Sequence, residues 1–230
     1  TRSLSSAASD VYKRQPLNVM ILVRPSGLTE LPSKTGSRLF GNSDELFLQS
    51  RPKRGLLTPA EVRSLSLAEL SLFSTSIVWD VGAGSGSLAV EAARLAPNGS
   101  VFAIEMDVDD HQLIEENAKR FGVDNLRAIL GQAPEAWSDL PDPDSIYVGG
   151  SGRSVTALVE QAWERLKPGG RLVTNCNSIE NLAAVHALLR SRSDDAGYWM
   201  VNIARGIEQM DRIRFEAINP NFLMAATKAG

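Results

Sequence analysis

Three glycines at alternate positions, Gly82, Gly84 and Gly86, form the stretch of this sequence best suited to chemistry. An apolar β-type run precedes them, and residues 88–95 after them carry the alanine-rich pattern of a closely packed helix. Glycines let the backbone approach a ligand and adopt positive φ, and a following helix presents unpaired N–H groups at its first turn. With Asp80 two residues ahead, the pattern predicts a cofactor cradle; a simple glycine-rich turn is the alternative.

The spacing of the glycines separates two kinds of cofactor. A dinucleotide fingerprint, G-x-G-x-x-G, would place its third glycine at position 87, which is Ser87. This disfavours a dinucleotide-binding oxidoreductase. The observed arrangement, with Asp80 before Gly82-x-Gly84-x-Gly86, resembles the first motif of Rossmann-like S-adenosylmethionine-dependent methyltransferases.

Further candidate residues follow the next predicted strands. Glu105 ends the strand 100–105, about 20 residues beyond Gly84, the spacing at which an acid accepts hydrogen bonds from ribose hydroxyls. Gln132 follows the strand 126–130 and is a candidate for contact with a base. Parallel strands present their carboxyl ends at one sheet edge, so these residues are expected to converge with the loop 149–152.

Strands and helices alternate along the chain, which predicts a doubly wound α/β domain. We expect a mostly parallel, seven-stranded sheet with helices on both faces, the class I methyltransferase form of the Rossmann-like fold. The predicted helices span about 109–121, 154–166 and 178–189, and the remaining strands 144–148, 171–175, 199–204 and 222–227.

Composition narrows the class of protein. The 230 residues are 43% hydrophobic and 22% charged, with a formal net charge of −3, so nothing favours nucleic acid as a partner. No apolar run approaches the roughly 20 residues that cross a bilayer, so no membrane partner is expected. The single cysteine, Cys176, suits a reducing, cytoplasmic location, and the two histidines form no metal-binding pattern.

The chain divides into three predicted segments. Residues 1–15 lack periodicity and are predicted to be a non-native or disordered tail. Residues 16–54 contain one short β-type run and then a stretch rich in Pro, Ser and Gly, which predicts a remnant strand and a linker. Residues 55–230 form the predicted catalytic domain. Its first helix is expected to carry a capping box from Thr58 to Glu61.

A larger set of motifs belongs together between Thr58 and Asn181. The motifs are Thr58-x-x-Glu61-Val62-Arg63, Trp79 to Ser87, Glu91-Ala92-Ala93, Ala103-Ile104-Glu105, Ala133-Pro134-Glu135, Val148 to Gly152, Leu166 to Arg171 and Glu180-Asn181. This set resembles the C-terminal domain of the decarboxylating precorrin-6Y C(5,15)-methyltransferases of cobalamin biosynthesis, and the resemblance covers residues 55–230. Two positions depart from the pattern: Pro59 stands in place of a common Lys, and Gln132 in place of a common Asp.

The resemblance implies methyl transfer from S-adenosylmethionine to carbon 15 of a precorrin, a tetrapyrrole, with loss of carbon dioxide from the ring-C acetate. It also implies a homo-oligomer such as a tetramer, and a tetrapyrrole methylase domain that precedes this one or acts as a separate partner protein. No catalytic nucleophile or base is assigned. Expected cofactor contacts are Asp80, Gly82, Ala83, Gly84, Ser85, Gly86, Glu105, Gln132, Ala133 and Gly149; expected substrate contacts are Thr58, Gly150, Ser151, Arg153 and Arg212, with Arg205 and Arg214 as further candidates.

Other functions stay open at this point, because a fold does not fix a substrate. A methyltransferase acting on RNA or another small molecule would use the same cofactor site. A base methyltransferase typically carries an Asn/Asp-Pro-Pro-aromatic element after the fourth strand, where this chain has Gly149-Gly150-Ser151-Gly152. A non-catalytic domain that binds S-adenosylmethionine is the alternative outside enzymology.

Overall fold

The computed structural model describes residues 36–50, 57–149 and 155–230. One compact unit spans Ser37–Gly230. Residues 37–49, predicted to be linker, therefore belong to the compact unit, and the start of this unit lies ahead of the expected position 55. The predictions for the tail 1–15 and for the strand near its end lie outside the described residues.

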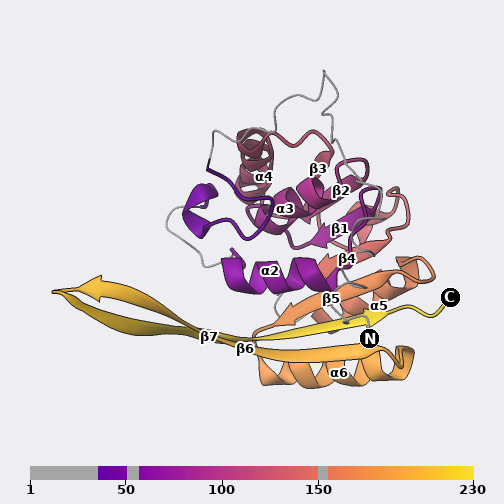
Figure 1. The fold of residues 1–230 in the computed structure, drawn as a ribbon. Coiled ribbons are helices and arrows are strands. Elements are labelled where there is room, and N and C mark those ends of the chain that lie inside the picture. Colours follow the sequence, from indigo (N-terminus) through magenta and orange to yellow (C-terminus); the bar gives the residue numbers. More distant parts are fainter. Residues whose placement is uncertain (1–35, 51–56, 150–154) are drawn as a thin grey trace, which may run out of the picture. The chain divides into compact units, whose positions relative to one another are not determined.

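A seven-stranded sheet forms the centre of the unit, in the order β3-β2-β1-β4-β5-β7-β6 (Figure 1). The first five strands in this order are parallel, and β7 runs antiparallel to both β5 and β6, which confirms the predicted, mostly parallel sheet. The strands are β1 (Ile77–Val81), β2 (Ser100–Glu105), β3 (Leu126–Leu130), β4 (Ser145–Val148), β5 (Arg171–Cys176), β6 (Ala196–Gln209) and β7 (Arg212–Thr227).

Helices cover both faces of the sheet, and each face has its own core. On one face, α2, α3 and α4 bury leucines and alanines against residues such as Val78 and Val173. On the other face, α5 and α6 pack against residues such as Trp79 and Leu172. The helices are α2 (Ala60–Glu69), α3 (Ser87–Leu95), α4 (Val108–Phe121), α5 (Val155–Arg165) and α6 (Ile179–Arg192), with short 3-10 turns η2 (Asp44–Leu46) and η3 (Glu135–Trp137).

The order of the strands changes direction at β1: β2 and β3 follow on one side of it, and β4 and β5 on the other. In open α/β sheets, ligands bind at the carboxyl ends of strands beside such a reversal. The glycine-rich turn leaves the carboxyl end of β1, so the topology places it at this position. None of the described helices is long and apolar enough to cross a membrane.

A two-stranded arm extends from the sheet where β7 continues beyond its pairing with β5, together with its partner β6 (Figure 1). Met210 and Asp211 form its tip, both with positive φ, as a two-residue hairpin turn requires. Only 199–204 and 222–227 were predicted as strand, and the prediction was wrong for 212–220. The signal was present, because residues 212–217 alternate between polar and apolar side chains, although they pair only with β6 and cover no core.

Helix ends confirm one predicted cap and contradict another. The Ser178 hydroxyl accepts a hydrogen bond from the Asn181 N–H, which caps α6 as expected. Thr58 does not cap α2, which begins one residue after Pro59 and has no side-chain cap. The first helical bond runs from the Arg63 N–H to the Pro59 carbonyl at 2.8 Å, so Pro59 takes the N-cap position and Thr58 lies one residue too early. The Arg63 guanidinium binds the Thr58 carbonyl at 2.7 Å.

Candidate functional site

The glycine-rich turn is bent by positive φ at all three glycines: +72° at Gly82, +54° at Gly84 and +76° at Gly86. Gly86 also lies where a side chain has no room, since a Cβ there would be 3.0 Å from the Ile114 side chain. The first intrahelical bond of α3 runs from the Val90 N–H to the Gly86 carbonyl. The N–H groups of residues 87–89 therefore have no partner within the helix, as at any helix N-terminus.

Glu105 is joined to this turn, as the sequence predicted. Its Oε2 accepts from the Gly84 N–H at 2.8 Å, and its Oε1 accepts from Met106 N and Asp107 N at 2.8 and 3.0 Å. An ionised carboxylate has about four acceptor positions. Three are used by the protein, and Oε2 retains one that a ligand hydroxyl could fill.

Asp80 lies beneath the turn and is almost fully buried. Burial raises the pKa of its carboxyl to about 7; the Ala89 N–H, which hydrogen-bonds it, opposes the rise, and the charge of Glu105 adds to it. Its Oδ2 has no hydrogen-bond partner among the described residues. The carboxyl therefore supports the turn from inside and keeps one oxygen uncommitted.

Ser85 and Gly149 bring two further groups to the same place. The Ser85 hydroxyl is buried and has no hydrogen-bond partner in the described part of the chain. Gly149 follows β4, donates its N–H to the Val81 carbonyl at 2.8 Å, and lies so close that a Cβ would be 2.9 Å from the Gly82 carbonyl oxygen. Only glycine allows the end of β4 to approach the turn in this way. Ala83 completes the turn and packs partly against the core.

Gln132 and Ala133 follow β3, the neighbour of β2. The Gly131 N–H donates to the Glu105 carbonyl at 2.9 Å, which fixes this loop beside the acid. The Gln132 side chain is exposed, and Ala133 packs against the core. The structure thus brings every predicted cofactor residue to one edge of the sheet.

Sequence reasoning missed two apolar side chains at this edge. Met106, immediately after Glu105, is 70% exposed, and Leu130, the β-sheet partner of Glu105, is 49% exposed. Exposed apolar side chains on either side of this acid offer a surface for a flat base. The available signal was a hydrophobic residue directly after the acid at a strand end, where no core remains to be covered.

Asn175 was also missed, although it ends β5 at the same edge. It is buried, and its Nδ2 donates to Asn221 Oδ1 at 2.9 Å, while the Asn221 amide donates to the Asn219 carbonyl. That carbonyl fixes the orientation of both amides and leaves Asn175 Oδ1 without a partner among the described residues. A polar side chain at the end of an apolar strand was the available signal.

Thr58 lies on the same face of the sheet. Burial raises the pKa of Tyr147 on β4 to about 12, and the nearby Thr58 side chain opposes the rise. The Tyr147 ring in turn contacts the position of Gly149. Thr58 is therefore near the carboxyl edge, whereas Gly150, Ser151 and Arg153 lie outside the described residues.

The structure does not bring the predicted arginines of the arm to this edge. Arg212 pairs with Gln209 at the arm tip, while β7 joins β5 only from Phe222 onward. A rise of about 3.3 Å per residue places Arg212 roughly 30 Å along the arm. Arg205, at the arm base, is bound to Asp44 and Glu61. Their sequence position gave no sign of this, because the arm was not predicted.

These groups fit S-adenosylmethionine. The carboxylate of Glu105 has an acceptor position left for a ribose hydroxyl, and Met106 and Leu130 can flank an adenine. Gly82 faces open space, since a Cβ there would meet nothing within 4 Å. The N–H groups at the start of α3 suit a carboxylate. The fold and site together define a class I, S-adenosylmethionine-dependent methyltransferase.

Comparison with known families narrows this class. The model of the precorrin methyltransferase domain matches residues 52–214, and the chain belongs to that family. A probable cobalt-precorrin-6B C(15)-methyltransferase (decarboxylating) from Pyrobaculum calidifontis is 35% identical over 188 residues, 81% of this chain and 95% of the relative. A precorrin-6Y C(5,15)-methyltransferase [decarboxylating] from Sinorhizobium is 37% identical over 70% of this chain, but the match spans only 37% of that relative.

Solved structures agree with the family. A precorrin-6Y C5,15-methyltransferase from Geobacter metallireducens superimposes with a TM-score of 0.77 at 32% identity, covering 84% of this chain and 100% of the other. The C-terminal domain of the Rhodobacter capsulatus precorrin-6Y C5,15-methyltransferase gives 0.72 at 28% identity, with coverage of 84% and 100%.

Proposed function

We propose that this chain methylates carbon 15 of a precorrin with S-adenosylmethionine and couples the transfer to decarboxylation of the ring-C acetate, in cobalamin biosynthesis. The names of its relatives support the substrate and the reaction. The observation that carries the proposal is the Glu105 carboxylate, which ties the glycine turn to the ends of β2 and holds an acceptor toward the ligand.

The chemistry demands little of the protein. The sulfonium of S-adenosylmethionine supplies an electrophilic methyl group, and the ring carbon, which is enamine-like, is already nucleophilic. As the new carbon–carbon bond forms, the carbon–sulfur bond breaks and S-adenosylhomocysteine leaves; the acetate loses carbon dioxide, and its carbon takes up a proton. The residues of the chain bind both reactants, align them and exclude water.

The precorrin is a polycarboxylate, which arginine can bind with two parallel hydrogen bonds. Arg153, beside Gly150 and Ser151, remains our candidate for this contact because these residues follow Gly149 at the carboxyl edge. Asn175 Oδ1 is a candidate acceptor for a ring N–H, since it lies at the neighbouring strand end without a partner among the described residues.

Mass spectrometry of the tetrapyrrole tests the proposal. The protein is incubated with S-adenosylmethionine and the intermediate already methylated at carbon 5. Gain of one methyl with loss of one carbon dioxide would support both activities, and methylation alone would assign the decarboxylation to another protein. An unchanged tetrapyrrole, in a sample whose cofactor binding is demonstrated by calorimetry, would overturn the assignment of a precorrin as the substrate.

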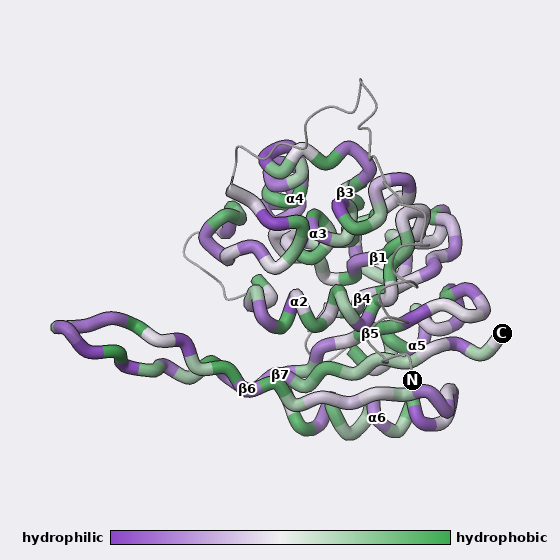
Figure 2. Tube along the Cα trace, in the orientation of Figure 1, coloured by the Kyte–Doolittle hydropathy of each residue, from purple (hydrophilic) through white to green (hydrophobic). Residues whose placement is uncertain are grey.

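We infer that the arm assembles copies of the chain into a homo-oligomer, such as a tetramer. One face of the arm is apolar: Ile213 and Phe215, 70% and 68% exposed, lie across Gly206, where a Cβ would meet both side chains. Apolar and polar residues intermingle along the arm in Figure 2. An isolated two-stranded ribbon is marginally stable in water, so the arm needs a second layer.

Sedimentation velocity of the Phe215→Glu variant tests this assembly. Glutamate would place a charge in the proposed contact, and the sedimentation coefficient should fall toward that of a monomer. Arg214→Glu, on the opposite face of the same strand, serves as the control and should sediment like the wild type. A monomeric wild type, or an assembly that Phe215→Glu leaves intact, would contradict the role of the arm.

Two broader expectations accompany the proposal. The Sinorhizobium relative extends well beyond the matched region. This supports a tetrapyrrole methylase domain, in the same chain or as a separate protein, that methylates carbon 5. The buried, unpaired thiol of Cys176 suits a cytoplasmic location, where thiols stay reduced.

A further inference from the structure

Residues 41–49, here called the strap, lie outside the region matched by the family model, which begins at residue 52. They contain η2 and come before α2 in the sequence. Three fully buried polar side chains, one from each of three helices, bond to the strap: Arg63 of α2, Glu91 of α3 and Asn117 of α4. Buried polar groups are costly unless they are hydrogen-bonded, so the strap completes the interior of the domain.

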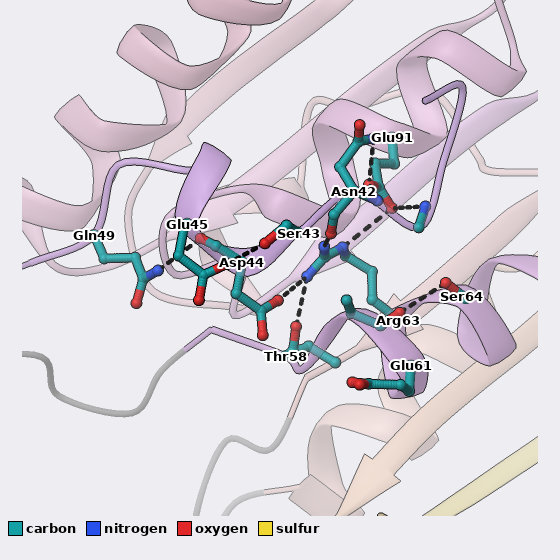
Figure 3. A network of polar contacts seen from close by, with 12 residues as sticks. Asn42, Ser43, Asp44, Glu45, Gln49, Thr58, Glu61, Arg63, Ser64 and Glu91 are labelled. Atoms are coloured by element: carbon teal, nitrogen blue, oxygen red, sulfur yellow. Dashed lines mark hydrogen bonds and ion pairs between the residues drawn. The ribbon is translucent and has the colours of Figure 1, made fainter. Parts of the chain in front are cut away.

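Glu91 receives most of its hydrogen bonds from the strap. Its carboxylate accepts from the Gly41 N–H at 3.1 Å, and from the backbone N–H and side-chain amide of Asn42, both at 2.8 Å. Arg63 Nε supplies the fourth bond at 3.1 Å. Figure 3 shows these contacts meeting at the Glu91 carboxylate. Without the strap, the carboxylate would be left buried with one donor.

Arg63 is held in the same manner. Its guanidinium donates to the Asn42 carbonyl at 2.5 Å and to Asp44 Oδ1 at 3.1 Å, both in the strap, and to the Thr58 carbonyl at 2.7 Å (Figure 3). It also lies over the ring of Phe47 at 4.8 Å from the ring centre. Arg63 therefore fastens the strap to the start of α2.

Asn117 connects the strap to the glycine turn. Its Oδ1 accepts from the Leu48 N–H at 2.8 Å, and its Nδ2 donates to the Leu48 carbonyl at 3.0 Å, as a neighbouring strand would. The second hydrogen of Nδ2 goes to the Ser85 carbonyl at 2.9 Å. One amide thus bonds both to the strap backbone and to the turn that receives the cofactor.

We propose that Asn117 is a positioning residue for S-adenosylmethionine and that the strap holds it in place. The Ser85 carbonyl is directed to a buried amide in the interior, so it does not face the ligand. The N–H side of the peptide that it shares with Gly86 is held by the Ala83 carbonyl at 2.9 Å, and the Asn117 amide adds the restraint on the carbonyl side, at a glycine that tolerates many backbone conformations. A carbonyl oxygen turned into the site would repel the carboxylate of the methionine moiety. Leu48 keeps the Asn117 amide in the orientation that prevents this.

Asn117→Ala and a matched variant, Asn125→Ala, test the role of the amide. The Asn125 amide also donates two hydrogen bonds to backbone carbonyls, those of Ala93 and Ala96, but at the opposite end of α3. Calorimetric Kd values for S-adenosylhomocysteine, measured well below the Tm of every variant, should rise about tenfold in Asn117→Ala and less than twofold in Asn125→Ala. An unchanged Kd in Asn117→Ala, or equal rises in both variants, would overturn the proposal.

A double-mutant cycle tests the part played by the strap. Phe47 stacks on Phe121 of α4 with ring centres 4.6 Å apart, so Phe47→Ala loosens the strap next to Leu48. Phe47→Ala should raise the Kd about threefold in the wild-type background and leave it unchanged when combined with Asn117→Ala. Phe47→Leu, which keeps an apolar contact, should restore nearly wild-type affinity. Additive effects would show that the strap acts by another route and overturn its role.

The inference rests on the methyl-donor site and not on a precorrin as the methyl acceptor. A wild-type protein that binds no S-adenosylhomocysteine would overturn both this inference and the proposed function. Normal binding with an unreactive tetrapyrrole would overturn only the proposed substrate. An Asn117→Ala variant that binds like the wild type would overturn only the role of Asn117.

Discussion

The two edges of the sheet differ in how far their polar groups are paired within the chain. At the amino edge, Asp144 accepts from the Ile77 N–H and from Lys167, and Arg171 binds Glu69 and Asp195. At the carboxyl edge, three buried atoms have no partner among the described residues: Asp80 Oδ2, Ser85 Oγ and Asn175 Oδ1. The charged groups named at the amino edge therefore all have partners within the chain.

Unsatisfied buried polar atoms are uncommon because each costs free energy. Trp79 Nε1 and Tyr147 Oη also have no partner among the described residues, but they belong to residues inside β1 and β4. The three at the carboxyl edge lie beside the glycine turn or at neighbouring strand ends, which indicates that a ligand completes this edge. At the amino edge, a hollow is lined by residues such as Ser76, Asp144 and Arg171. Asp144 is paired with Lys167 and Arg171 with Glu69, so these charges call for no ligand.

The largest expected contrast is between two carboxylates that each hold a backbone N–H at a strand end. Glu105→Ala removes a charged acceptor from the ligand and releases the Gly84 N–H, so affinity for S-adenosylmethionine should fall by about 3 kcal/mol, or two orders of magnitude. Asp144→Ala should leave the calorimetric Kd unchanged and lower the Tm. If Asp144→Ala weakened binding as much as Glu105→Ala, the two edges would not differ in function.

A second contrast is the pH dependence of unfolding. The folded pKa of Asp80, raised to about 7, lies above its unfolded value of 3.8. Its contribution to stability is fully present below the unfolded pKa and is lost as pH rises through about 7. Between pH 5 and 8 the free energy of unfolding of the ligand-free protein should therefore fall by roughly 2–3 kcal/mol relative to Asp80→Asn.

Urea unfolding of both proteins across this range gives the comparison. Parallel pH profiles for wild type and Asp80→Asn would contradict the burial of a titrating carboxyl at this edge. The effect should appear without ligand, because it depends on burial of the oxygen that the protein leaves without a partner.

A smaller effect is expected where the two halves of the site touch. Gly149→Ala places a Cβ 2.9 Å from the Gly82 carbonyl oxygen, so the end of β4 and the turn must separate by a few tenths of an ångström. Cofactor affinity should fall about tenfold, or ~1.4 kcal/mol. Gly122→Ala, at a helix end with open space around the Cβ, is the control: it introduces strain at positive φ but should leave the Kd as in wild type. If Gly149→Ala and the wild type bound the cofactor with equal affinity, the end of β4 would not be part of the cofactor site.

Local patterns in the sequence predicted most of the parallel half of the fold. The strands around β1 and the stop of α4 at Gly122 follow from apolar runs and turn residues, which are short-range signals. The convergence of Gly84, Glu105 and Gly149 followed from topology alone, since parallel strands share one edge.

The parts that could not be predicted depend on contacts between distant segments. Residues 37–49 have the composition of a linker, and their order comes from Glu91 and Asn117, which lie about 50 and 70 residues further along the chain. The arm is an exception: residues 212–217 alternate between polar and apolar side chains, so a local strand signal was available there and was missed. Thr58 has the right type for a cap, but the Pro59 carbonyl accepts the first helical bond, so Thr58 lies one residue ahead of the cap position.

The smallest effect separates two buried serines. Ser145 at the amino edge donates to the Leu70 carbonyl at 2.9 Å, whereas the Ser85 hydroxyl has no partner among the described residues. Ser145→Ala leaves a carbonyl unsatisfied and should lower stability by about 1 kcal/mol with no change in Kd. Ser85→Ala removes an unsatisfied hydroxyl, so the stability of the ligand-free protein should hold or rise, while affinity falls about threefold to tenfold. Calorimetry measures the Kd and urea unfolding measures the stability of both variants. A Ser85→Ala variant that loses stability and keeps its affinity would mean that the hydroxyl serves the fold, and the carboxyl edge would then resemble the amino edge after all.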